Sequence, residues 1–156
     1  MYKNAIVKLS ALMLSICICV VLAACGSSGS TPATTKAANG YNDGTYEGRS
    51  QDHDDDEDGN GAGYGTVTLT IEGGKITECE FIMYELDGTL KDDSYGADLS
   101  RENRLKAQKA VQSAPKYAQM LVEAGSLDGV DAISGATISH DEFIEAVNDA
   151  LGKAAK

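Results

Sequence analysis

The residues with the clearest chemical potential lie in one short stretch, Asp131–Ser139, which reads DAISGATIS. It holds three hydroxyl groups, on Ser134, Thr137 and Ser139, among small residues that let a ligand approach the backbone closely. An amphipathic segment follows directly, and a helix starting there would offer the unpaired N–H groups of its N-terminus to a phosphate. The stretch therefore suggests a phosphate-binding turn with hydroxyl groups beside it.

The same stretch also has a purely structural interpretation. Residues 139–142 read SHDE, which fits a capping box in which Ser139 caps the helix and Glu142 reaches back to it. Asp141 and Glu142 would then stand in the first turn, where they would repel a phosphate. Taken alone, these residues favour the cap over a phosphate site.

A second candidate site is the acidic run at residues 52–58, DHDDDED. Asp54, Asp56 and Asp58, with a glycine after them, match the first half of a calcium-binding loop, in which alternate carboxylates converge on one ion. The second half is missing, because position 12 of such a loop is Gly65 here and not a bidentate glutamate. The three aspartates are weak metal candidates, and a solvated insertion held open by charge repulsion is the favoured interpretation.

The elements that must position these residues begin with a hairpin. Residues 66–71, TVTLTI, alternate polar and apolar side chains as a half-buried strand does, and Gly73-Gly74 follows as a tight turn. A second strand is expected from Lys75 to Leu86, and a short one at residues 43–48 ahead of the pair. The side chains expected on the buried face of the second strand are Thr77, Cys79, Phe81 and Met83.

Helical periodicity dominates the C-terminal half. Ser100 is a candidate N-cap for a helix whose apolar residues recur at spacings of three and four, and Gly125 suits its C-terminal end. Pro115 interrupts the pattern, so either this helix kinks or a second one begins at Pro115. A last helix is expected from His140 to Leu151. Strands followed by helices predict an α+β fold, with a hairpin-rich antiparallel sheet and the C-terminal helices packed on one face.

Composition bounds the classes of partner. The chain has 156 residues, 42% of them apolar, and a net charge of −11. This is enough for one modest globular domain with its own core. Because no basic surface is available to neutralise a phosphate backbone, nucleic acid is not an expected partner, and cationic or small partners are favoured.

The N-terminus is typical of a bacterial lipoprotein signal. Lys3 and Lys8 precede an apolar run at residues 11–24, and Leu-Ala-Ala at the end of this run is followed by Cys25. The run has 14 residues, whereas a membrane-spanning helix needs about 20. We therefore expect residues 1–24 to be a signal peptide cleaved before Cys25, with Cys25 lipidated. The mature protein would then stand on the outer face of the cytoplasmic membrane.

Processing would leave a tethered domain with one thiol. Residues 25–40 comprise the lipidated cysteine and a small, polar tether, and residues 41–156 form the folded domain, with an acidic insertion at 52–61. Loss of two lysines takes the net charge from −11 to −13. Cys79 is then the only free thiol, so no intramolecular disulfide is expected, and its place in a strand predicts a buried, unreactive side chain.

The stretch at Asp131–Ser139 resembles the flavinylation motif D-x-x-S/T-G-A-T-x-S/T of the FMN-binding domain family, which occurs in bacterial redox complexes and exported flavoproteins. The likeness begins at residues 41–48, YNDGTYEG, continues through the hairpin to the last helix, and covers nearly all of residues 41–152. In that family FMN is joined through its phosphate to the hydroxyl of the final Ser or Thr of the motif. The resemblance thus implies a covalent FMN on Ser139, with Thr137 as the fallback acceptor.

The resemblance also implies a set of cofactor-binding residues. In many relatives, a Gly-rich loop before the first helix touches the isoalloxazine ring, and this chain has Tyr95 and Gly96 at that place. Tyr95 could offer an aromatic face to the flavin or pack beneath its own loop, and both interpretations stay open. The residues implied by the motif itself are Asp131, Ser134, Gly135, Ala136, Thr137 and Ser139.

Together these features predict a membrane-anchored, extracytoplasmic electron carrier with one covalent FMN. It would relay electrons from a membrane donor, a dehydrogenase or quinone, to an extracellular or membrane acceptor, and a flavin-attaching transferase would load it. The sequence offers no nucleophile with a matching base, so no residue is predicted to be catalytic and the chain is an electron-transfer protein rather than a stand-alone catalyst. The alternative is a calcium-binding or small-ligand-binding surface lipoprotein without redox activity.

Overall fold

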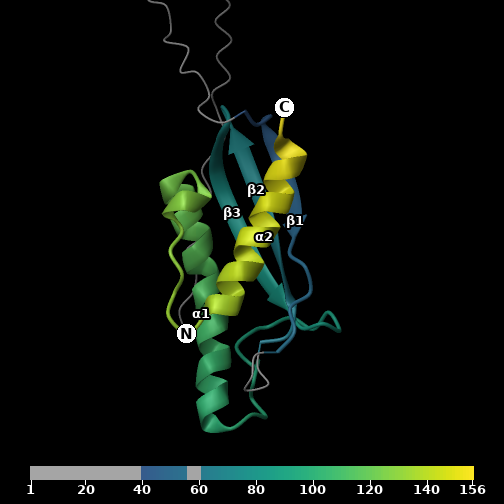
Figure 1. Ribbon diagram of the computed structural model, residues 1–156, viewed down its shortest axis with the longest axis vertical. Coiled ribbons are helices and arrows are strands. Elements are labelled where there is room, and N and C mark those ends of the chain that lie inside the picture. The colour runs from purple at the N-terminus through teal and green to yellow at the C-terminus, as the bar shows by residue number, and fades with distance from the viewer. Residues whose placement is uncertain (1–39, 56–60) are drawn as a thin grey trace, which may run out of the picture. The chain divides into compact units, whose positions relative to one another are not determined.

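Three antiparallel strands follow one another in chain order across a sheet: β1 (Gly44–Arg49), β2 (Tyr64–Glu72) and β3 (Lys75–Tyr84) (Figure 1). The structure is a computed structural model that describes residues 40–55 and 61–156. The strands alternate toward and away from one buried face, as expected of a sheet that is covered on one side.

Several sequence predictions fall outside the described residues. These are the signal peptide, lipidation at Cys25, the tether up to residue 39, and the aspartates Asp56 and Asp58 of the acidic insertion. Within residues 40–55 and 61–156, no helix has the length and apolar character needed to cross a bilayer.

The strands β2 and β3 form the predicted hairpin. Gly73 and Gly74 at its turn have φ values of 58° and 71°, a backbone region that glycine enters without steric cost. Phe81 and Met83 are buried as predicted, and Cys79 is half-buried. The strand β3 ends at Tyr84, two residues before its predicted end, and the chain then turns away into a long loop.

A bulge changes which residues of β3 face the core. Thr70 pairs with Glu78, whereas the next residue, Ile71, pairs with Ile76, so Thr77 is left out of the pairing. Ile76 therefore turns inward and is buried, and Thr77 is exposed. The prediction that Thr77 lies on the buried face is wrong, because a strict alternation along the strand takes no account of the extra residue.

The helix α1 spans Arg101–Ala124 without a break. Both of its predicted ends are confirmed: the Ser100 side chain accepts a hydrogen bond from the Asn103 N–H, and Gly125 adopts the left-handed conformation with φ of 69°. The alternative in which a second helix begins at Pro115 is wrong. Buried residues lie on both sides of the proline, and their packing holds the helix together despite the missing N–H.

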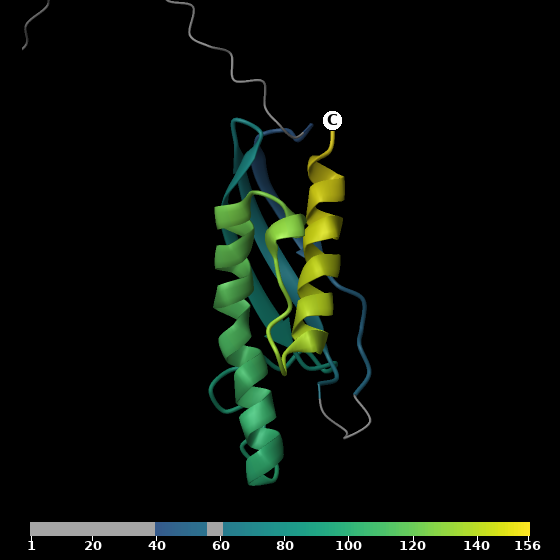
Figure 2. The same cartoon turned by 60° about the vertical axis from the view of Figure 1, so that its left-hand side comes forward.

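The helix α2 (Thr137–Ala154) follows a short 3₁₀ helix, η1 (Leu127–Gly129). Both long helices lie on the same face of the sheet, α2 over β1 and β2 and α1 along β3 (Figures 1 and 2). This arrangement confirms the predicted α+β fold. The largest fully buried side chains between the layers are Val67, Leu69, Ile71, Tyr117, Leu121, Glu142, Phe143 and Val147.

Helix α2 packs closely on β1 at Gly48. A Cβ at this position would overlap the Ala146 carbonyl oxygen and would also collide with Ala150. The absence of a side chain on Gly48, together with two alanines on the facing helix, therefore lets the two backbones meet. This contact sets how closely α2 can approach the sheet.

Candidate functional site

The helix α2 begins at Thr137, three residues before its predicted start, with Ala136 as the N-cap residue. A side chain of α1 explains this early start. The Tyr117 hydroxyl accepts a hydrogen bond from the Ile133 N–H and donates one to the Ala136 carbonyl, both at 3.0 Å. These two bonds hold the turn at 133–136 in place, so that the helix can begin directly after it.

The predicted capping box is wrong. Ser139 lies in the first turn instead of at the N-cap, and Glu142 is fully buried instead of reaching back. Ala136 has no side-chain group to cap the helix. The first intrahelical bond runs from the His140 N–H to the Ala136 carbonyl at 3.0 Å, so the N–H groups of residues 137–139 precede the helical ladder. Such groups are suited to binding an anion.

The early helix start also removes the expected repulsion. The first turn of α2 contains no acidic residue, because Asp141 and Glu142 fall in the second turn. The dipole of α2 and its leading N–H groups are therefore not opposed by a carboxylate in the first turn.

A pocket of about 370 Å³ opens beside the start of α2. Small-molecule sites have volumes of about 300–1,000 Å³. The walls come from the end of the acidic insertion, the loop before α1, the first half of α1 and residues 135–139. The lining residues are Gly61, Lys91, Tyr95, Leu99, Lys106, Ala107, Ala110, Gly135, Ala136, Thr137, Ile138 and Ser139.

The pocket brings together five residues that the family resemblance implies: Tyr95, Gly135, Ala136, Thr137 and Ser139. Thr137 is exposed, whereas Ser139 is buried. Within the described part of the chain, the Ser139 hydroxyl has no hydrogen-bond partner. It is thus available to a ligand that enters the pocket.

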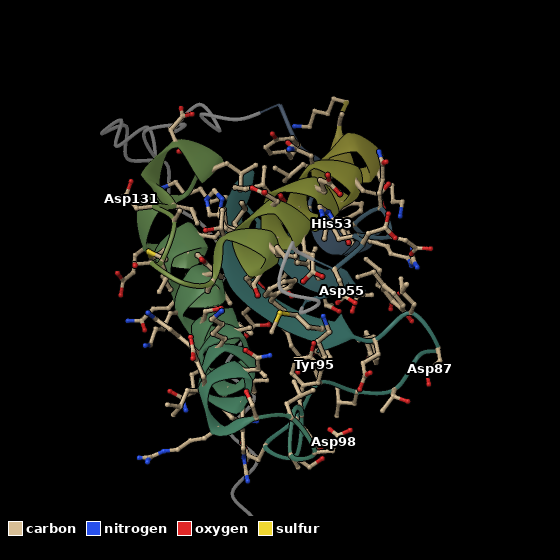
Figure 3. All side chains as sticks on the ribbon, turned by 60° about the horizontal axis from the view of Figure 1, so that its bottom comes forward. His53, Asp55, Asp87, Tyr95, Asp98 and Asp131 are labelled. Atoms are coloured by element: carbon tan, nitrogen blue, oxygen red, sulfur yellow. The ribbon has the colours of Figure 1, made fainter. Side chains whose placement is uncertain are left out.

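Three other predicted residues do not line this pocket. Asp131 is exposed and lies well apart from Tyr95 and Asp55 (Figure 3). Ser134 is exposed just before the pocket wall. Gly96 is buried with φ of 75°, and a Cβ there would collide with the Ala107 side chain on α1. The absence of a side chain on Gly96 therefore lets the loop pack on the helix.

The lysines of the site were not predicted from the sequence. Lys91 and Lys106 line the pocket, and the side chain of Lys109 lies beside Gly135. In a chain of net charge −11, this group of cations is the feature that suits the pocket to an anionic ligand. Ala107 and Ala110, which also line it, were recognisable in the sequence only as part of an apolar helix face.

Lys91 is held firmly in the wall. Its ammonium donates a hydrogen bond of 3.0 Å to the Gly61 carbonyl and lies 5.2 Å from the centre of the Tyr95 ring. The Lys91 ammonium is 3.8 Å from Glu142 Oε1, which is too long for a hydrogen bond. Burial lowers the pKa of Lys91 and raises the pKa of Glu142, although each charge partly offsets the shift of the other.

The described part of the acidic insertion forms protein contacts. His53 pairs with Gly63 across the base of the insertion, and its ring nitrogen Nε2 lies 3.1 Å from Glu145 Oε2. Asp55 accepts a hydrogen bond of 2.9 Å from the Ala62 N–H, and Asp54 is exposed. Within residues 40–55 and 61–156, no three His, Cys, Asp or Glu side chains are grouped as metal ligands would be.

Comparison with known proteins gives one family and one fold. The FMN-binding domain family matches residues 60–152. No curated protein matches the chain. Among solved structures, the crystal structure of the CPE2226 protein from Clostridium perfringens is similar, with a TM-score of 0.53 and 21% sequence identity over 73% of this chain and 88% of that chain. At this identity, the similarity to CPE2226 shows a shared fold and nothing further.

Proposed function

We propose that this chain, which belongs to the FMN-binding domain family and is a flavin-binding protein, carries FMN covalently on Ser139. The link would be a phosphoester between the flavin's phosphate and the Ser139 hydroxyl. One observation carries the proposal: Ser139 lines a pocket at an uncapped helix start, and its hydroxyl has no partner within the described residues.

The residues present fit both ends of FMN. The leading N–H groups of α2 and the nearby Lys106 and Lys109 suit the phosphate, because both supply positive charge to an anion. The ring system needs flat, largely apolar walls, which Tyr95, Leu99 and Ile138 provide. Gly135 lines the pocket with φ of 77°, and a side chain there would crowd the Lys109 ammonium.

Bound FMN would supply reversible electron transfer, and the protein would supply attachment, orientation and charge. Attachment at Ser139 keeps the cofactor beside the start of α2, and the apolar walls exclude water from one side of it. Lys91 holds a positive charge in the wall nearest Tyr95. The net charge of −11, or −13 after processing, favours partners with basic surfaces.

The proposed electron route starts from the expected lipid anchor at the N-terminus. Lipid on Cys25 and a polar tether would hold the domain on the outer face of the cytoplasmic membrane, free to reorient. There it would accept electrons from a membrane donor, a dehydrogenase or quinone, and pass them to an extracellular or membrane acceptor. Loading requires a flavin-attaching transferase in the same compartment.

The attachment is tested by expressing the chain with a flavin-attaching transferase and measuring visible absorption after denaturation. Wild-type protein should stay yellow, and Ser139→Ala should be folded and colourless, because the hydroxyl has no hydrogen bond to any described residue that the variant would lose. Ser134→Ala is the matched control, since Ser134 lies in the motif but outside the pocket. Peptide mapping should find the flavin on Ser139. Flavin on Thr137 would refute the residue assignment, and no covalent flavin at all would refute the attachment.

The anchor is tested separately with Cys25→Ala. The wild-type protein should be recovered in the membrane fraction and the variant should not. Determination of the mature N-terminus then distinguishes lipidation from an uncleaved signal. A variant that stays in the membrane with a cleaved N-terminus would refute the lipoprotein assignment.

A further inference from the structure

The carboxylate of Glu142 is in an unusual position for a stabilising ion pair. It is completely buried, and neither oxygen has a hydrogen-bond partner among the described residues. The nearest cation, Lys91 Nζ, is 3.8 Å from Oε1 and donates a hydrogen bond to the Gly61 carbonyl instead. Buried ion pairs repay their desolvation only with close geometry and further hydrogen bonds, and this pair has neither.

Its position relative to the pocket suggests a different role. Glu142 is one helical turn after Ser139 on α2, and Lys91 lines the pocket that contains Ser139. The ammonium therefore stands between the buried carboxylate and the space where the flavin is proposed to bind. A change of charge in the pocket acts on Lys91 directly and on Glu142 through it.

We propose that Lys91 and Glu142 form a proton-binding site that takes up one proton at Glu142 when the flavin in the pocket becomes negatively charged on reduction. The proposal rests on the flavin function proposed above. In the oxidised protein the pair is Lys91 ammonium and Glu142 carboxylate, with no net charge. A negative charge in the pocket draws the ammonium toward itself, and the carboxylate, left without its cation, binds a proton.

Electrons, protons and charge balance in this step. A donor of the dehydrogenase or quinol class delivers two electrons to the flavin, which takes one proton from solvent and keeps one negative charge. Glu142 takes a second proton from solvent and becomes a neutral carboxylic acid. The total uptake is two electrons and two protons, and the added charge inside the protein is zero.

Other titratable groups near the pair also shift the pKa of Lys91 or Glu142, but they are less buried. Glu145 on α2 and His53 at the base of the acidic insertion act on Glu142. Glu85, Asp55 and Tyr95 act on Lys91 or lie beside it. The completely buried Glu142 is the group whose ionised form burial penalises most directly, which agrees with the upward shift of its pKa.

The test is infrared difference spectroscopy of the flavin-loaded protein, reduced minus oxidised at an electrode and at neutral pH. Wild-type protein should gain a protonated carboxyl signal on reduction and lose it on reoxidation. Glu142→Gln should lack this signal. Because the variant takes up one proton fewer, its equilibrium constant for reduction should change per pH unit by a factor ten times smaller than in wild-type protein. Asp149→Asn is the matched control, because it removes an acid of the same helix whose carboxylate bonds to Lys153 and the Arg49 N–H and not to Lys91, and it should keep the signal.

Each result decides the proposal. Absence of the signal in wild-type protein overturns the proposal without recourse to any variant, and so does persistence of the signal in Glu142→Gln or its loss in Asp149→Asn. If the flavin proves to be bound but not covalent, the covalent attachment fails, and the same spectra are recorded with added FMN. If the protein binds FMN neither covalently nor noncovalently, both proposals are overturned.

Discussion

Removal of the Lys91 cation is the sharpest test of how the pocket wall is held together. Lys91→Met keeps much of the side-chain volume but leaves the Glu142 carboxylate buried and alone. The two side chains are 3% and 1% exposed, and the charged atoms are 3.8 Å apart. At an effective dielectric constant of about 20, Coulomb's law gives about 4 kcal/mol for this separation. Measured losses on breaking one side of a buried pair are about 3–5 kcal/mol. We expect a loss of this size in unfolding free energy.

The loss should depend on pH in a defined direction. Burial raises the pKa of Glu142 above the ordinary value of 4.5, so the folded protein binds a proton that the unfolded chain has already released. The cost of burying the carboxylate is therefore absent below pH 4.5 and fully present above the raised pKa. Urea unfolding of the flavin-free protein should show the loss in Lys91→Met at neutral pH and none at pH values below 4.5.

Two further variants serve as controls for this prediction. Lys153→Met removes an exposed lysine whose ammonium lies 2.8 Å from an Asp149 carboxylate oxygen, and it should cost less than about 1 kcal/mol. The double variant Lys91→Met with Glu142→Leu should recover at least wild-type stability, because no charge is left buried. A loss in Lys91→Met that is equal at both pH values, or a double variant as unstable as the single one, would show that packing and not charge is at stake.

Three further predictions concern the elements around the site. Tyr117→Phe removes two hydrogen bonds from the 133–136 turn and should cost about 1–3 kcal/mol and lower flavin loading, measured by urea unfolding and by absorption after denaturation. Gly48→Ala should destabilise the domain by about 1–3 kcal/mol or more because its Cβ overlaps α2, whereas Gly152→Ala, which has open space around it, should not, by thermal unfolding. Burial raises the pKa of Cys79 to about 12, so a thiol reagent at pH values well below 12 should modify it slowly in native protein and quickly in urea.

The sequence could predict those parts of the fold that depend on local patterns. Alternation over residues 66–71 and the two turn glycines specify the hairpin, and the caps at Ser100 and Gly125 specify the ends of α1. The fate of Thr77 could not be predicted, because one extra residue in a bulge reverses the side-chain direction without changing the strand's composition. Pro115 likewise stays inside α1 because burial on both sides of it outweighs a local penalty.

The site shows the same division between local and long-range information. The motif residues from Gly135 to Ser139 are contiguous, so a pattern can point to them, and the structure places all five of them in one pocket. Lys91 and Glu142 are separated by 50 intervening residues, and neither has a sequence context that marks it as buried. Only the packing of the loop before α1 against α2 brings the two charges within 3.8 Å. A pair of this kind therefore cannot be predicted from the spacing of residues along the sequence.

The start of α2 connects these two kinds of information. If Ser139 capped the helix, its hydroxyl would accept a hydrogen bond from the backbone and would not be available for attachment. Tyr117, a residue of α1, instead secures the preceding turn, and the helix begins at Thr137 with its leading N–H groups uncapped. The proposed chemistry of Ser139 thus depends on a tyrosine 22 positions earlier in the chain. It follows that loss of the Tyr117 hydroxyl should reduce attachment even though that hydroxyl bonds to the turn before the helix and not to Ser139 itself.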